Sequence, residues 1–498
     1  MDFLHEGEDM DFNVFSYLLF CLWFLTGFYT MKYVSSNSRG LGKHASVLLF
    51  LAPFLGPVIL GISYCLKENF SIPEFFRKMF SGITADHGDE ITLTILDRNG
   101  QDLFSGSNAV YSDAAIYLRD MIAQAVERSC SDIFIDPKET VYVIRFRIDG
   151  AIRVFDTVNE VEAASLVSLI KVASGMDIAE KRRPQDGSFS AEKTDGVNIS
   201  FRVASVGVFG GEKITIRLIG SENSKRSLAE TGLSNRQLQI VRNGIKLPSG
   251  MVLMCGPTGS GKTSTLYSML GEIDYNMKNV ISIEDPIERV IPSISQMEVN
   301  ARAGITFANL LRNSLRQNPD ILCVGEIRDE ETAQVAAHAS QTGHLIIATL
   351  HSNDNIGTIM RLMDLGIPLR AIAACLHLSI SQRLVRKLCP NCKRKVEMTP
   401  EQKEFCARYG IGETPLYVPA GCPACDSTGY AGRRAIFELL VMDNGLRAAM
   451  EAPDATITSI QEYLNNNPPD STLAGRAMRL VLDGETSWDE FERININI

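Results

Sequence analysis

The chain of 498 residues carries a formal net charge of −10, and 45% of its residues are hydrophobic. This acidic average argues against nucleic-acid recognition through the charge of the whole molecule, although it does not exclude a local basic patch. The length allows roughly three domains, each with its own core. Eleven cysteines fit reduced thiols and a metal site better than a disulfide framework, which is typical of short secreted chains.

Two apolar runs without charged residues lie near the N-terminus. They cover residues 12–31 and 45–66, and each is close to the ~20 residues that cross a hydrocarbon core as a helix. The segment before the first run is acidic, which argues against a cleaved signal peptide. A pair of buried core helices is the alternative, but two such runs so close together favour a membrane-associated segment over residues 1–70.

The orientation of these runs is open, because Lys32, Arg39 and Lys43 lie between them and draw the connecting loop toward the cytoplasm. Two full spans would then place the rest of the chain outside. Three arrangements avoid this outcome: two spans against the charge rule, a shallow hairpin of both runs, or one span followed by a re-entrant segment. The last is favoured, since Pro53 and Pro57 would interrupt a second spanning helix.

Residues 71–106 form a turn-rich connector that could hold one short strand, and a regular pattern begins near residue 107. Helices are expected over 113–129 and 161–174. Strands are expected over 132–135, 141–148, 197–204 and 213–218, with a hairpin turn at Asp149-Gly150 and a polar loop at 180–187. Residues 107–221 therefore predict an α+β domain, and the polar residues 222–232 an interdomain linker.

From residue 233 onward, short apolar strands alternate with helices. The expected strands are 251–255, 279–283, 321–324 and 345–350, and the expected helices are 262–273, 307–318 and 332–340. Such alternation implies a parallel sheet flanked by helices, so residues 233–498 predict an α/β domain. Its C-terminal part is expected to be largely helical around a cysteine-rich loop.

A phosphate-binding loop is the strongest motif of the chain. The pattern G-x-x-x-x-G-K-[ST] is matched at every fixed position between an apolar strand and a helix. Glycines allow the backbone N–H groups to turn toward phosphates, and the following helix N-terminus adds partial positive charge. We expect Lys262 on the β- and γ-phosphates of ATP and the Thr263 hydroxyl on Mg²⁺. The nucleotide-binding residues are therefore Gly256, Pro257, Thr258, Gly259, Ser260, Gly261, Lys262 and Thr263.

Two carboxylates complete a hydrolytic site. Glu326 follows the strand 321–324, from where a carboxylate can reach Mg²⁺ through water, and Glu284 follows the strand 279–283, where it could orient the attacking water. Each acid alone could be a helix cap. Together, on neighbouring strands of a sheet that carries a phosphate loop, they predict ATP hydrolysis.

From about residue 107 to the C-terminus, the chain resembles the ATPases of type II secretion and type IV pilus assembly. The segment 283–288 (IEDPIE) is similar to the aspartate box of that family, 318–329 to its Walker B motif, and 342–352 to its histidine box. The resemblance implies an α/β fold class, with a RecA-like P-loop ATPase core preceded by a smaller α+β domain.

The resemblance also implies roles for single residues. Glu284 would be the general base or water-orienting residue, Glu326 the carboxylate on the Mg²⁺ side, and His344 and His351 sensors of the γ-phosphate. Arginines from the α+β domain and from before Walker B approach the nucleotide in this family, and the matching positions are Arg202, Arg217 and Arg312. Without the resemblance, the histidines would be interpreted as structural hydrogen-bonding residues and the arginines as solvated side chains.

Three positions depart from the family. Phe134 stands where the family usually has histidine, Asn318 where aspartate is common, and the segment 206–210 lacks the usual Leu-Pro-Thr. Asn318 leaves Glu326 in place, so the expected Mg²⁺ site is retained. The N-terminal residues 1–100 lie outside the resemblance.

Two C-x-x-C pairs predict a zinc site. Four thiolates at this spacing can surround one tetrahedral ion and leave no position for water, so the role would be structural. A redox pair is the alternative, which the second pair disfavours. The family's retraction ATPases lack such an insertion and its assembly branch has it, so the resemblance favours assembly. The expected zinc ligands are Cys389, Cys392, Cys422 and Cys425, in a subdomain at 389–425.

The resemblance further implies a homohexamer that acts on an inner-membrane platform protein to assemble pilin or pseudopilin subunits. The ATPase domain would lie on the cytoplasmic side of the bacterial inner membrane, and the N-terminus would contact the membrane. This location requires one of the three arrangements of the apolar runs 12–31 and 45–66 described above. The alternative function is a nucleic-acid-translocating motor of a conjugation or DNA-uptake system, which would need a basic channel that no run in the sequence provides. A scaffold without hydrolysis is disfavoured by the complete catalytic set, and no direct nucleic-acid contact is expected.

Overall fold

The computed structural model describes residues 93–104, 113–194, 197–219, 227–300, 303–467 and 472–494. The predicted membrane-associated segment 1–70 and most of the connector 71–106 lie outside the described residues. Among the residues that are described, no helix is both long and apolar enough to cross a membrane. The described residues contain two large sheets, and each sheet with its helices is described by itself.

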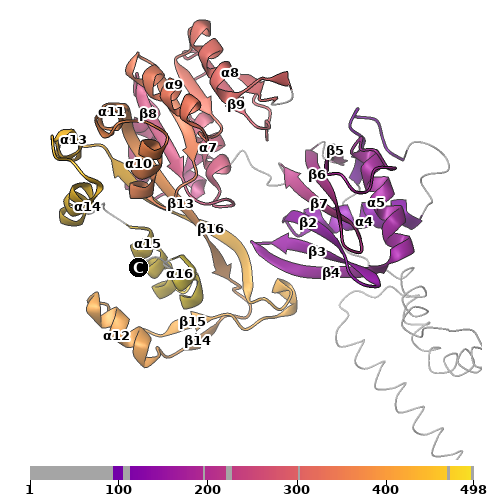
Figure 1. The fold of residues 1–498 in the computed structure, drawn as a ribbon. Coiled ribbons are helices and arrows are strands. Elements are labelled where there is room, and N and C mark those ends of the chain that lie inside the picture. The colour runs from indigo at the N-terminus through magenta and orange to yellow at the C-terminus, as the bar shows by residue number, and fades with distance from the viewer. Residues whose placement is uncertain are drawn as a thin grey trace, which may run out of the picture. The chain divides into compact units, whose positions relative to one another are not determined.

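The first sheet has seven strands in the order β1-β5-β6-β7-β2-β3-β4, and every neighbouring pair is antiparallel. Along β3 the residues alternate between buried and half-buried, so one face is packed and the other is partly open. The helices α4 and α5 lie against the packed face (Figure 1). The elements are β1 (Leu93–Leu96), α4 (Asp113–Glu127), β2 (Cys130–Pro137), β3 (Val141–Ile148), β4 (Ala151–Asn159), α5 (Glu160–Ala173), β5 (Gln185–Lys193), β6 (Asn198–Val208) and β7 (Gly211–Ile219).

This α+β region contains more strands than the sequence indicated. The short strand β1, expected in the connector, pairs with β5 at the edge of the sheet. The strand β5 begins at Gln185, within the segment expected as a polar loop. The strand β4 follows the hairpin turn expected at Asp149-Gly150, although its bounds were not predicted. A capping box at Asn159, whose side chain accepts from the Glu162 backbone N–H at 2.9 Å, starts α5 directly after β4.

The second sheet has the order β10-β9-β11-β12-β8-β13-β16, which is parallel except for the antiparallel β13–β16 pair. It confirms the predicted α/β fold. The strands are β8 (Gly250–Cys255), β9 (Val280–Glu284), β10 (Ser295–Glu298), β11 (Ile321–Val324), β12 (Leu345–Leu350), β13 (Leu376–Leu388) and β16 (Tyr430–Val441).

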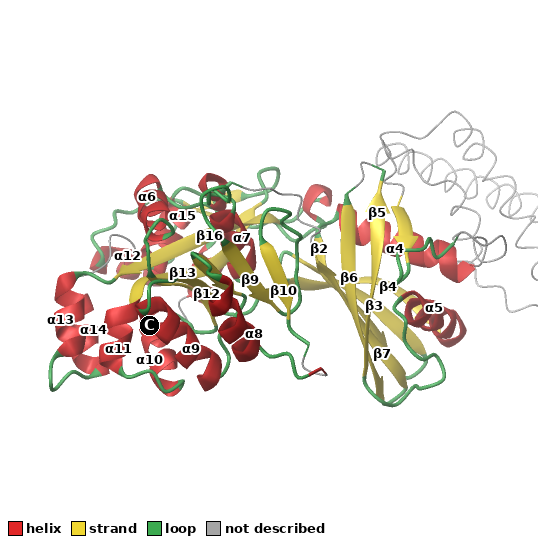
Figure 2. Cartoon of the chain, turned by 90° about the horizontal axis from the view of Figure 1, so that it is seen from above, coloured by secondary structure: helices red, strands yellow, loops and turns green. Residues whose placement is uncertain are grey.

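Helices cover both faces of the second sheet, as Figure 2 shows. The side chains of β8 alternate between two cores: Leu253 packs with α8–α11, and Met254 with α6 and α7. Every residue of β8, β9, β11 and β12 is buried, as expected for a parallel sheet covered on both sides. The helices are α6 (Asn235–Gly244), α7 (Lys262–Leu270), α8 (Phe307–Ser314), α9 (Glu330–Gln341), α10 (Asn355–Asp364) and α11 (Leu369–Cys375).

The C-terminal part is less helical than the sequence indicated, because the long strand β16 runs through it. The expected linker also has a packed end, where Leu228 is fully buried in the core beneath α7. The remaining elements are the pair β14 (Arg394–Val396) and β15 (Leu416–Val418), α12 (Pro400–Arg408), α13 (Asn444–Glu451), α14 (Ile457–Asn466), α15 (Leu473–Leu482), α16 (Trp488–Ile494), and 3-10 turns at Leu228–Thr231, Leu315–Gln317 and Pro423–Cys425.

Candidate active site

The phosphate loop connects the C-terminal end of β8 to the first turn of α7, as predicted. Gly256, Gly259 and Gly261 have φ angles of +151°, +75° and +87°, a region that residues with a side chain rarely adopt. A Cβ on Gly261 would lie 2.7 Å from the Gln382 side-chain nitrogen, and one on Gly256 would lie 2.6 Å from the Gln382 carbonyl oxygen. Glycine is therefore required both by the backbone and by the close approach of β13.

Lys262 lies inside this loop. Its side chain is buried, and its ammonium group donates to the carbonyl oxygens of Gly256 at 2.7 Å and Pro257 at 3.1 Å. Burial lowers the pKa of Lys262, because the charged form has lost water without gaining a neighbouring carboxylate in contact. A phosphate would supply the missing negative charge.

Unpaired polar atoms gather around the loop. Of the seven buried side-chain nitrogen and oxygen atoms without a partner in the described chain, four lie here: Ser260 Oγ, Ser381 Oγ, Gln382 Oε1 and Arg383 Nη1. A buried polar group without a partner costs about 1–3 kcal/mol, so such a cluster in a folded protein needs an explanation. A nucleotide and its water, bound in the glycine-lined loop, fit these groups.

Glu326 stands beside the loop at the end of β11. Its carboxylate is paired with Arg328 and lies 3.5 Å from His351 Nε2, which follows β12. Burial and the nearby Lys262 lower the pKa of His351, which favours the neutral imidazole. The structure therefore brings together Lys262, Glu326 and His351, at the edge where β8, β11 and β12 end.

Glu284 ends β9 at the same edge of the sheet and is 6% exposed. Its carboxylate accepts hydrogen bonds from the Tyr267 hydroxyl, from Ser282 Oγ at 2.6 Å and from Gln296 Nε2 at 3.0 Å. A carboxylate held by three donors has a fixed direction, which suits a residue that orients water. Tyr267 and Gln296 were not predicted, because only the packing of α7 and β10 brings them to Glu284.

The structure does not bring His344 to this cluster. His344 precedes β12, its ring Nδ1 lies 3.2 Å from the Ala339 carbonyl oxygen, and its own carbonyl accepts from Gly250 N at the start of β8. The six residues of β12 span about 20 Å at ~3.3 Å per residue. His344 therefore lies at the opposite end of β12 from His351, and its role as a sensor of the γ-phosphate stays a prediction.

The predicted arginines come from α8 and from the first sheet. Arg312, on α8, pairs with Glu331 at 2.6 Å. Arg202 and Arg217 lie directly opposite each other on β6 and β7 of the first sheet. Arg217 contacts Asp132 at 2.9 Å, whereas the exposed Arg202 has no partner among the described residues. Two like charges opposite each other are unfavourable, so this pair suits an anion.

Phe134 stands on the open face of the first sheet, where the family usually has histidine. Arg145, Arg147 and Lys213 place their cationic groups 5.9, 5.3 and 6.0 Å from its ring centroid. The ring therefore lies among cations that attract its π-face, a contact that needs no titratable group at this position.

The four predicted cysteines form one cluster. Their sulfur atoms all lie within 4.8 Å of one another, and the separations include 3.9 Å for Cys389–Cys422 and 3.8 Å for Cys392–Cys425. Four ligands at ~2.3 Å from a tetrahedral zinc ion are about 3.8 Å apart, so the geometry fits zinc. Partial burial opposes ionisation of Cys425, but N–H groups of Cys422 and Gly429 hold the pKa of its thiol at about 6.

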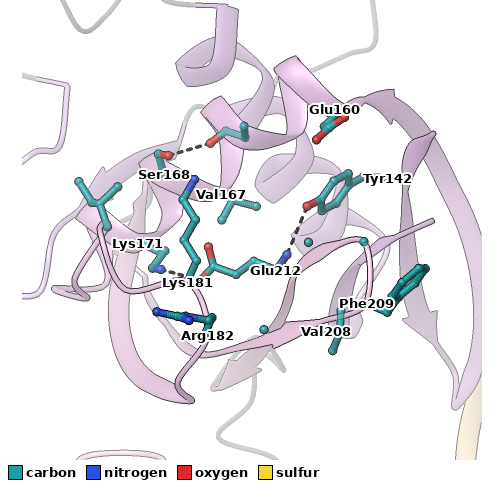
Figure 3. Close-up of a pocket in the computed structure, with 15 residues that line it drawn as sticks. Tyr142, Glu160, Val167, Ser168, Lys171, Lys181, Arg182, Val208, Phe209 and Glu212 are labelled. Carbon is teal, nitrogen blue, oxygen red and sulfur yellow. Dashed lines mark hydrogen bonds and ion pairs between the residues drawn. The ribbon is translucent and has the colours of Figure 1, made fainter. Parts of the chain in front are cut away.

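A separate hollow of about 560 Å³ lies in the first domain, between α5, the loop 178–182 and the β6–β7 hairpin (Figure 3). On its floor, Lys171 Nζ contacts Glu212 Oε1 at 2.5 Å, and Ser205 Oγ donates to the same oxygen at 2.7 Å. None of the unpaired buried atoms of the described chain belongs to its lining. The buried polar side chains at the hollow are therefore paired with one another.

Residues 111–493 match the family described as "Type II/IV secretion system protein". The chain is 40% identical over 416 residues to the type II secretion system protein E of Klebsiella pneumoniae, covering 82% of each chain. It is 37% identical over 420 residues to the type II secretion system ATPase E of Vibrio cholerae, covering 84% of this chain and 82% of that one.

Solved structures share the fold. The Legionella pneumophila ATPase DotB aligns with a TM-score of 0.56 and 22% identity, over 77% of this chain and 96% of that one. The pilus retraction motor PilT aligns with a TM-score of 0.51 and 24% identity, over 76% of this chain and 96% of that one.

Proposed function

We infer that this chain, which belongs to the family of type II/IV secretion system proteins, is an ATP-hydrolysing motor that powers assembly of a secretion pseudopilus or a pilus. One observation supports ATP hydrolysis at this site: the glycine-lined loop holds the buried Lys262 near the Glu326 carboxylate and a cluster of unpaired polar atoms. The two relatives are type II secretion proteins, which favours type II secretion over pilus assembly.

The proposed chemistry follows from the positions of the side chains. Lys262 would leave its loop carbonyls and bind the β- and γ-phosphates, and the Thr263 hydroxyl and Glu326 would hold Mg²⁺. A magnesium ion bound there would neutralise charge on the phosphates. Glu284 would orient the attacking water, and the neutral His351 would contact the γ-phosphate from the end of β12.

The cysteine cluster is proposed to bind structural zinc. Cys389 follows β13 directly and its N–H donates to the Gly429 carbonyl, one residue before β16 begins. The ion would therefore join the ends of the two strands at the edge of the second sheet. Four thiolates leave no position for a catalytic water.

The assembly and the location are further parts of the proposal. The chain would act as a homohexamer on an inner-membrane platform protein, with the ATPase domain on the cytoplasmic side and the apolar runs 12–31 and 45–66 in contact with the membrane. Arg202 and Arg217, which lie opposite each other on β6 and β7, would approach the nucleotide from the α+β domain. A hexamer of open and closed subunits would turn hydrolysis into motion.

Complementation tests this function. In a strain that lacks the gene, the wild-type chain should restore export of secreted proteins or assembly of pilin-like filaments, whereas Lys262→Ala at equal abundance should not. Restoration by Lys262→Ala would contradict a role for ATP hydrolysis. ATPase activity that DNA stimulates and the platform protein does not would support the nucleic-acid motor instead.

A further inference from the structure

Tyr267 connects the helix of the phosphate loop to Glu284. It lies on α7, five residues after Lys262, and is 6% exposed. Its hydroxyl donates to Glu284 Oε2 and accepts the backbone N–H of Arg289 at 3.1 Å. Burial and the Glu284 carboxylate raise the pKa of Tyr267, so the phenol stays protonated and remains a donor at neutral pH.

The loop after β9 is tied to the same group of atoms. The Arg289 guanidinium lies 4.8 Å from the centroid of the Tyr267 ring. Gln296 Nε2 donates to Glu284 Oε1 at 3.0 Å and to the Arg289 carbonyl at 2.9 Å, and Gln296 Oε1 accepts from Ile291 N at 2.6 Å. Residues 284–291 are therefore held from two sides, by α7 and by β10.

The three donors to Glu284 differ in whether they fix only its rotamer or also its position relative to the phosphate loop. Ser282 lies on the same strand, two residues earlier, so it sets the rotamer of Glu284 but not its place relative to the nucleotide. Gln296 lies on the neighbouring strand β10. Tyr267 alone among these donors comes from the helix whose first residue is Lys262. A carboxylate has about four acceptor positions, so three donors leave one for water.

We propose that Tyr267 is a positioning residue for ATP hydrolysis, which holds the carboxylate of Glu284 in register with the phosphate loop. The inference rests on the proposed role of Glu284. Lys262 and Tyr267 lie on one rigid helix, so the hydroxyl fixes the distance between the group that binds the phosphates and the group that orients the water. Small errors in such a distance lower the rate of the chemical step more than the affinity for substrate.

The test compares two tyrosines of the full-length chain. Tyr267→Phe removes the hydroxyl and keeps the ring, and we expect kcat to fall by ~10- to 100-fold while the KM for ATP changes by less than about threefold. Tyr275→Phe is the matched control, since its hydroxyl donates to the Leu270 carbonyl at 2.6 Å and not to Glu284. The control should keep kcat within about twofold. Equal losses in both variants, or a normal kcat for Tyr267→Phe, would overturn the proposal.

A double-mutant cycle separates positioning from packing. If Tyr267 acts through Glu284, then Tyr267→Phe should cause no further loss of kcat in a Glu284→Gln background. If the fold losses of kcat in the two single variants multiply in the double variant, the proposal is contradicted. It is also contradicted if Ser282→Ala lowers kcat as much as Tyr267→Phe does. Normal turnover of Glu284→Gln would instead refute the proposed role of Glu284. Melting temperatures of all variants, measured without nucleotide, show whether each is folded.

Discussion

The phosphate loop and the hollow of the first domain differ in how their buried polar groups are paired. At the hollow, Lys171 forms an ion pair with the Glu212 carboxylate, so the two charges neutralise each other (Figure 3). The Ser205 hydroxyl, which is not part of the lining, donates to the same carboxylate. At the loop, Lys262 has only backbone carbonyls and Ser260 has no partner. Buried polar groups that are paired with one another stabilise the fold, whereas buried groups without a partner indicate a place where a ligand could bind.

Removal of zinc from the cysteine cluster is expected to have the largest effect on stability. The cluster extends the comparison of paired and unpaired groups to a metal site. Its four thiols have few partners besides one another and a few backbone groups, so we expect one zinc ion per chain. Removing it with a strong chelator should destabilise the subdomain by on the order of 10 kcal/mol, since ligand binding and folding are coupled there. Elemental analysis and thermal denaturation measure both effects. A chain without zinc that melts at the same temperature after chelation would contradict the prediction.

Lys262→Ala should lower turnover by about 10³-fold, because the transition-state charge on the phosphates loses its cation. The unfolding temperature without nucleotide should not fall, since the lost side chain is a desolvated charge without a carboxylate partner. Steady-state phosphate release measures the turnover, and thermal denaturation of the same preparation measures the unfolding temperature. A large loss of stability would mean that Lys262, like Lys171, is a structural residue.

Lys171→Met should lower stability and leave turnover unchanged, which is the reverse of Lys262→Ala. It leaves the Glu212 carboxylate buried without its cation, at a cost of about 3–5 kcal/mol in unfolding free energy. Turnover per folded molecule should stay unchanged. Denaturant unfolding measures the first quantity, and an ATPase assay corrected for the folded fraction measures the second. Lost turnover at full stability would show that the hollow is a functional site after all.

The smallest effects come from a matched pair of serines. Ser205→Ala removes the hydroxyl that donates to Glu212 and should lower stability by ~1–2 kcal/mol, with no change in the KM for ATP. Ser260→Ala removes an unpaired hydroxyl from the loop, so stability should not fall, while the KM should rise severalfold. If the two variants behave alike in both assays, the difference in pairing has no functional meaning.

Local patterns predicted the parts of the site that depend on spacing alone. The phosphate loop requires glycines at fixed positions, and the C-x-x-C pairs bring sulfurs together within one turn, so both were readable in the sequence. The buried strands β8, β9, β11 and β12 were found because a covered parallel sheet needs continuous apolar runs.

Contacts that depend on strand order could not be predicted in the same way. Gln382 and Arg383 reach the loop because β13 lies beside β8, and Gln296 reaches Glu284 because β10 lies beside β9. His344 and His351 flank the predicted strand 345–350, so its length of six residues indicates from the sequence that the two histidines lie at opposite ends of a strand. The edge strands β4, β10 and β16 carry polar residues and gave no clear strand pattern.

Release of inorganic phosphate from ATP by the purified, assembled wild-type chain, with and without Mg²⁺, tests the central claim most directly. We expect steady release with Mg²⁺ and almost none without it. A folded, assembled preparation that releases no phosphate with Mg²⁺ present would contradict the assignment of the loop, Lys262 and Glu284 to ATP hydrolysis.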